Sequence, residues 1–168
     1  VLGNPAVETN VEEICTRAGK TVGGFYFHFK GIDDYLAALA QLWRERFTGD
    51  LIRATRAAAP PAKRLDLLNY LAIHLDVGIE QGIRRLAARE PAIADLVSAV
   101  DRQRTDYLAE LYEASGRYTP RQAQSLARIE YAAFVGMQLT ETATSASDLL
   151  ALYDDFLELT GRRTGPGG

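Results

Sequence analysis

The side chains best suited to chemistry are few in this sequence and widely spaced. His28 and His74 are the two histidines, and Cys15 is the single cysteine. The adjacent acidic residues Glu12–Glu13 and Asp154–Asp155 would point to different sides of a helix, so neither pair can share a metal ion. There is no Gly-rich phosphate loop, His-Glu-x-x-His motif or nucleophile elbow. We therefore predict no catalytic residues, no metal site and no cofactor.

Length and composition indicate a soluble globular protein. The 168 residues suffice for one domain with a substantial core, and 47% apolar with 24% charged residues is ordinary. No apolar run approaches the roughly 20 residues that span a bilayer, and no secretion signal is visible. A single cysteine fits a reducing compartment, so we expect a cytoplasmic protein.

The net charge gives no general attraction for nucleic acid. It is −3 over the whole chain, with a pI near 5.4. Residues 1–48 carry five basic and six acidic side chains. Phosphate contacts need local positive charge, so composition alone argues against DNA binding.

The most unusual stretch is "GKTVGGFYFHF" at residues 19–29. Two adjacent glycines suggest a hairpin turn, and the aromatic run that follows is typical of a strand. A flexible loop over an aromatic cluster is a second interpretation. A short helix is the third, and the residues upstream favour it.

Upstream, "TNVEEICTRAG" has helix signals at both ends. Asn10 can cap this helix with Glu13 three residues later, and Gly19 suits the left-handed residue that follows its end. Thr21 can cap a second short helix over residues 22–29. Two short helices joined by a glycine-containing turn form a helix-turn-helix arrangement.

If the aromatic run is helical, its side chains point to different sides of the helix. Phe25 and Phe29 are four residues apart and are predicted to face inward, whereas Val22, Tyr26 and His28 project outward. The glycines lower helix propensity but permit a surface to approach the backbone closely.

The rest of the chain shows helical periodicity, so we predict an all-α fold. The long helix that starts at Ile32 should end at Pro60–Pro61, because proline cannot continue it. A second helix should run over residues 62–81 and stop at Gly82. Further helices are expected over residues 91–114, 120–143 and 147–160.

Residues 10–40 resemble the DNA-binding segment of the TetR family of one-component transcriptional regulators. The matching positions are Val11, Ile14, Ala18, Gly19, Thr21, Gly23, Phe25, Tyr26, His28, Phe29, Asp33 and Leu36. Three positions depart from the family pattern. The family usually has Val or Ile at the position of Lys20 and Thr, Ser or Ala at the position of Gly24. It usually has Lys at the position of Ile32. The family's first helix is mostly absent.

The resemblance implies a homodimer that places two recognition helices in successive major grooves of operator DNA. It implies a helix-turn-helix domain over residues 1–48, a ligand-binding and dimerisation domain over 49–162, and a disordered tail over 163–168. The residues that it assigns to DNA are Asn10, Lys20, Thr21, Val22, Gly24, Tyr26, His28 and Lys30.

In the larger domain the resemblance implies an effector pocket and a two-fold bundle of the last two helices. The predicted pocket residues are Trp43, Phe47, Tyr70, His74, Tyr107, Leu111, Tyr131, Phe134 and Met137. The predicted dimer residues are Ala127, Ala132, Gly136, Leu149, Tyr153 and Phe156. A small, largely apolar effector would release the protein from DNA by binding one conformation more tightly.

The sequence leaves three classes of function. The preferred one is a regulator, most simply a repressor, and the resemblance carries it. The second is a helical ligand-binding or interaction protein with weakened or lost DNA binding, which Gly24, Ile32 and the acidic balance favour. An enzyme is the third, and it lacks the side chains to build a site.

Overall fold

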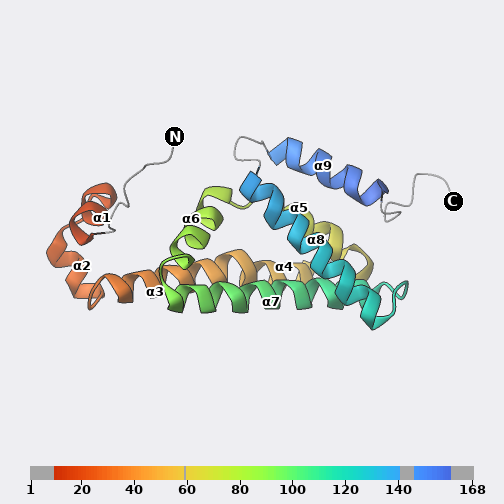
Figure 1. Cartoon of the computed structure of the whole chain (residues 1–168), viewed down its shortest axis with the longest axis horizontal. Coiled ribbons are helices and arrows are strands. Elements are labelled where there is room, and N and C mark those ends of the chain that lie inside the picture. Colours follow the sequence, from red (N-terminus) through yellow and green to blue (C-terminus); the bar gives the residue numbers. More distant parts are fainter. Residues whose placement is uncertain (1–9, 59, 141–145, 160–168) are drawn as a thin grey trace. The chain divides into compact units, whose positions relative to one another are not determined.

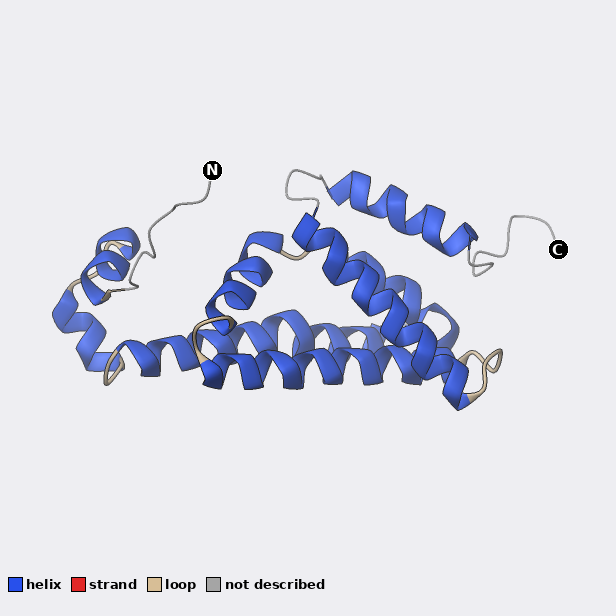
Figure 2. Ribbon diagram, in the orientation of Figure 1, coloured by secondary structure: helices blue, strands red, loops and turns tan. Residues whose placement is uncertain are grey.

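The computed structural model describes residues 10–58, 60–140 and 146–159. Every regular element in these ranges is a helix (Figures 1 and 2). The all-α prediction is therefore confirmed. None of the described helices combines the length and apolarity needed to cross a bilayer. The chain divides into two compact units, Val1–Leu42 and Trp43–Gly168, and the tail predicted over 163–168 lies outside the described residues.

The first unit contains two short helices whose ends are capped as the sequence suggests. In α1 (Val11–Ala18), the Asn10 side chain accepts a hydrogen bond from the Glu13 amide at 2.7 Å, and Gly19 adopts φ 63°. In α2 (Val22–His28), the Thr21 hydroxyl accepts from the Gly24 amide at 3.0 Å. The aromatic run is thus helical, and its strand and loop interpretations are wrong.

The two faces of α2 differ sharply in exposure. Phe25 is 6% exposed, and its ring lies 5.3 Å from that of Phe29 and 5.6 Å from that of Tyr35. Tyr26 is 56% exposed and Phe27 84%. The predicted inward position of Phe25 and outward position of Tyr26 are therefore confirmed.

A continuous helical segment follows, and the chain passes from the first unit to the second within it. It comprises α3 (Ile32–Arg44), a π-helical turn (Glu45–Gly49) and α4 (Asp50–Ala58). A π-turn inserts an extra residue into the helix, and such turns are frequent at functional sites. The sequence pattern did not predict this turn, although Pro60 and Pro61 follow the segment's end as expected.

The predicted single helix over residues 62–81 is wrong. A short 3₁₀ turn (Pro61–Lys63) leads into α5 (Arg64–Ile73), and α6 (Val77–Ala87) starts after a break. The break forms because Asp76 caps α6, accepting from the Gly78 amide at 2.8 Å. Gly82, predicted to end the helix, lies inside α6.

Three longer helices complete the second unit: α7 (Pro91–Ala114), α8 (Pro120–Thr140) and α9 (Ala146–Leu159). α7 packs against α6 and α8, and α5 packs against α9. One core cluster joins Leu108, Ala109 and Tyr112 of α7 to the fully buried Ala123 and Ala127 of α8. Small residues at this contact allow the two helices to approach closely.

Candidate functional site

The second unit contains a mostly apolar cavity. The π-turn and α4 to α9 or their flanking residues contribute to its wall. The volume open to the centre of a water molecule is about 70 Å³. Its apolar lining includes Phe47, Leu51, Ile52, Leu68, Ile73 and Phe134, and its polar lining includes Asn69, Glu80, Arg104, Glu130, Tyr131 and Gln138. Apolar walls with a few polar groups are typical of small-molecule sites.

Four of the nine predicted pocket residues line this cavity: Phe47, Tyr107, Tyr131 and Phe134. Trp43 and Leu111 are buried elsewhere in the core, 2% and 5% exposed. Met137 packs against the cluster of Ile73 and Tyr153. The prediction is wrong for these three because helical spacing identifies a buried face but not which buried residues border a void.

Tyr70 and His74 were also predicted to line the pocket, and they lie on the surface instead. Tyr70 is 55% exposed, and His74 terminates α5. The His74 Nδ1 atom lies 2.6 Å from the Tyr70 carbonyl oxygen, and the two rings lie 4.4 Å apart. Both side chains therefore lie outside the cavity.

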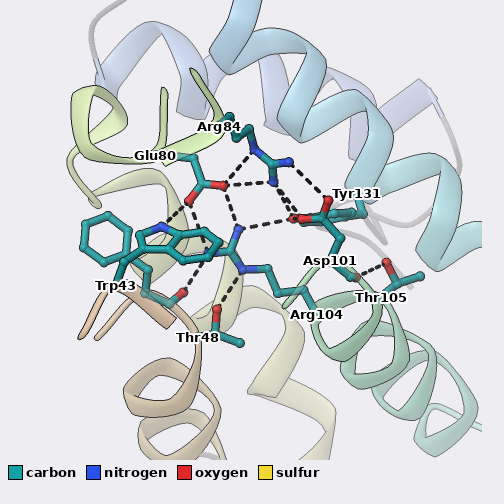
Figure 3. Close-up of polar contacts among 9 residues, drawn as sticks. Trp43, Thr48, Glu80, Arg84, Asp101, Arg104, Thr105 and Tyr131 are labelled. Atoms are coloured by element: carbon teal, nitrogen blue, oxygen red, sulfur yellow. Dashed lines mark hydrogen bonds and ion pairs between the residues drawn. The ribbon is translucent and has the colours of Figure 1, made fainter. Parts of the chain in front are cut away.

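A buried carboxylate organises the polar end of the cavity (Figure 3). Glu80 of α6 is 4% exposed. It accepts hydrogen bonds from Trp43 Nε1 at 2.9 Å, from Arg84 Nε at 3.0 Å and from Arg104 Nη1 at 3.0 Å. A buried charge is tolerated only when it is paired and hydrogen-bonded, and both conditions hold here.

Arg104 joins this carboxylate to the π-turn. Its Nε donates to Thr48 Oγ1 at 2.8 Å, and its Nη2 reaches the Phe47 carbonyl oxygen at 3.4 Å. The guanidinium carbon also lies 5.1 Å from the centre of the Trp43 ring, a cation–π distance. The end of α3, the π-turn, α6 and α7 therefore meet around Glu80.

Asp101 and Tyr131 extend the network to α8. The Tyr131 hydroxyl donates to Asp101 Oδ1 at 2.6 Å and accepts from Arg84 and Arg104 at 3.0 and 3.2 Å. Burial, followed by the contact with Asp101, raises the pKa of Tyr131 to about 12. Burial alone would raise the pKa of Asp101, but hydrogen bonds from Arg84 and Tyr131 leave that pKa below its ordinary value.

A second buried carboxylate lies at another part of the wall. Glu130 of α8 is 4% exposed and accepts hydrogen bonds from the hydroxyls of Tyr112 and Tyr153 and from the side-chain amide of Asn69. These contacts hold α5, α7 and α9 against α8. Tyr153 therefore makes these contacts within its own chain.

The predicted DNA-contact residues all lie on exposed parts of the first unit. Asn10 and Thr21 cap the two short helices. A Cβ atom at Gly24 would approach Thr21 Oγ1 to 3.2 Å, so a larger residue would crowd this cap. The other predicted DNA-contact residues have exposed side chains: Lys20, Val22, Tyr26, His28 and Lys30.

The predicted dimer residues divide between the two sides of the bundle. Ala132 is exposed and Gly136 half-buried on the outer face of α8. Ala127 is 0% and Tyr153 8% exposed, so neither can contribute area to an interface. Phe156 packs against the Ile73–Tyr153 cluster. The assignments of Ala127 and Tyr153 are corrected because these side chains are buried within one chain, whereas Phe156 is only partly buried and stays a prediction. The Leu149 side chain lies outside the described residues.

No protein-family model matches this sequence, and a comparison with curated proteins found no match. The described residues also hold no cluster of three or more His, Cys, Asp or Glu side chains suited to a metal ion. The assignment of a function therefore depends on the geometry of the two units and on the sequence resemblance.

Removing Glu80 tests the buried network. In Glu80→Ala, two largely buried arginines lose their shared carboxylate, so the free energy of unfolding should fall by about 3–5 kcal/mol. The matched control is Glu110→Ala, which breaks a half-exposed pair with Arg56 and should change stability by about 0–1 kcal/mol. Urea denaturation measures both. Equal losses would contradict the assigned role of Glu80.

Replacing Tyr131 tests its hydrogen bonds through pH. The folded chain holds the Tyr131 proton more tightly than the unfolded chain, whose tyrosine pKa is about 10. Stability from this group is therefore complete below pH ~10 and is lost as pH rises toward ~12. Tyr131→Phe should be less stable than wild type near neutrality, and urea denaturation at stepped pH should show the difference narrowing above pH ~10. A difference in stability that stays constant across this pH range would contradict the raised pKa of Tyr131.

Proposed function

We propose that this protein is a TetR-like transcriptional regulator, most simply a repressor. As a homodimer it would bind operator DNA through α2 of each subunit. A small, mostly apolar effector would occupy the cavity of the second unit and weaken DNA binding. The observation that carries the proposal is the division of α2 into a buried aromatic side and an exposed side that its own unit leaves uncovered.

The exposed side of α2 has the chemistry that reading a major groove requires. Val22 is 40% exposed and offers methyl groups to a thymine methyl, and Tyr26 offers a hydroxyl to base edges or phosphates. At Gly23 an added Cβ would meet nothing within 4 Å. A surface can therefore approach the backbone of α2 closely.

Cationic and polar side chains flank this face and would fix its position on the duplex. Lys20 precedes α2 and Lys30 follows it, and both are exposed. Contacts from such side chains to phosphates set register and orientation, whereas base contacts specify sequence. The acidic side chains nearby are partly engaged: Glu13 pairs with Arg17 at 2.6 Å, and Asp34 accepts from the Lys30 amide at 3.0 Å.

The outer face of α8 is the surface that we assign to the second copy. Ile129 is 59% and Leu139 50% exposed. Between them Ala132, Val135 and Gly136 form the apolar part of a shallow groove, which Asp101, Arg128 and Tyr131 also line. Two copies of such a face can pack closely about a two-fold axis, since each presents the same apolar edges and small centre.

The continuous helical segment offers a route from the cavity to the first unit. Phe47 and Thr48 belong to the π-turn and line the cavity, and Trp43 is bonded to Glu80. An effector in the cavity therefore contacts the segment that continues into α3. If the effector binds one position of this segment more tightly than another, the free energy of DNA binding changes by the difference between the two effector-binding free energies. This difference is typically about 1–3 kcal/mol.

The face of α2 is tested by Tyr26→Ala. We expect binding to duplex DNA from the region upstream of the protein's own coding sequence to weaken at least about tenfold, about 1.4 kcal/mol. Because Tyr26 is 56% exposed, Tm should change little. Gel shift and thermal denaturation measure the two effects.

Tyr70→Ala is the matched control, since Tyr70 is 55% exposed in the second unit. It should leave DNA binding unchanged. Equal DNA binding by wild type and Tyr26→Ala would refute the assigned face. Absence of saturable binding by the wild type would favour a helical binding protein without DNA affinity.

The dimer surface is tested by Ile129→Asp. A charge buried at an apolar edge of the interface loses its solvent, so we expect sedimentation to show monomers where the wild type gives dimers. Ile79→Asp on α6 is the control, because Ile79 is 44% exposed outside this surface, and it should remain dimeric. An Ile129→Asp protein that stays dimeric would place the interface elsewhere.

A further inference from the structure

Gln138 is the feature of the cavity that the proposed function does not yet explain. Its side chain comes from α8, is 5% exposed and lines the cavity. Its Oε1 atom is buried and has no hydrogen-bond partner among the described residues. A buried acceptor without a partner lowers stability, so such atoms need an explanation.

The backbone of the same residue is already engaged. Gln81 Nε2 of α6 donates to the Gln138 carbonyl oxygen at 2.6 Å. This contact ties α6 to α8 beside the cavity and does not involve the Gln138 side chain. The side chain of Gln138 therefore borders the cavity with its buried Oε1 atom lacking a hydrogen-bond donor.

The charged groups of the wall, in contrast, have partners. Glu80 is bonded to Arg84 and Arg104. Glu130 accepts from three neutral donors. Asp76 accepts the first amides of α6. A charged occupant would lose its hydration here and would have to compete with these partners for a counter-charge, which is unfavourable in an apolar site.

The volume limits the size of the occupant. The space of about 70 Å³ is roughly half of the ~150 Å³ of an apolar cavity that holds one benzene molecule. A molecule of one or two rings therefore fits only if the surrounding side chains move outward. An extended drug-sized ligand would need far larger movements of the wall.

We propose that the cavity binds a compact, neutral, mostly apolar molecule that donates one hydrogen bond to Gln138 Oε1. An aromatic N–H or phenolic O–H on one or two rings has this chemistry. Under the proposed function this molecule belongs to the effector class, so the assignment to regulation rests on that function. The binding itself does not require DNA.

The test compares two probes that differ in one group. Indole donates through its ring N–H, whereas benzofuran has the same shape and an acceptor oxygen at that position. Isothermal titration calorimetry on the purified full chain should show indole binding at least about tenfold more tightly, because benzofuran leaves the Gln138 oxygen unpaired. Equal affinity, or no binding of either probe, would overturn the proposal.

Two variants test whether the difference in affinity between indole and benzofuran depends on the Gln138 side chain. Gln138→Met keeps the length of the side chain and removes the acceptor, so its preference for indole should disappear. Gln124→Met on the exposed side of α8 is the matched control and should keep the preference. If Gln138→Met fails to fold, which circular dichroism will show, the two-probe comparison on the wild type still decides.

The outcomes separate this inference from the proposed function. Indole selectivity without saturable DNA binding would support the ligand assignment and refute the regulator. DNA binding without selectivity between the probes would support the regulator and refute the ligand assignment.

Discussion

The second unit depends on the neutralisation of one buried charge, the Glu80 carboxylate. Its hydrogen-bond donors come from three helices: Trp43 at the end of α3, Arg84 on α6 and Arg104 on α7. None of these helices could shift far without leaving charge unpaired in an apolar surrounding. The positions of the cavity wall, the π-turn and the end of α3 are therefore set together.

This arrangement gives the proposed regulation a physical basis. Buried polar networks have a small number of satisfied arrangements, so they respond to a ligand by changing between states rather than by gradual deformation. Arg104 contacts both Glu80 and the π-turn residue Thr48. A ligand beside these groups would act on the same helical segment that continues into α3.

Local rules predicted the first unit well and the cavity only in part. Asn10 and Thr21 act as caps because capping depends on a few adjacent residues. The start of α6 was missed because Asp76 was not recognised as a cap. That error separated Glu80 from Arg84, although both lie one turn apart on α6. The contacts of Arg104 and Gln138 join distant parts of the chain, and no local pattern in one sequence indicates them.

The proposed binding of DNA by the first unit has to occur electrostatically despite a net charge of −3 for the chain. The most direct measurement is the dissociation constant of the full chain on duplex DNA from its own upstream region as a function of salt. For a dimer making roughly 6–10 phosphate contacts, affinity should fall by about 10³-fold or more between about 50 and 200 mM salt. Absence of saturable binding, or an affinity independent of salt, would contradict the account.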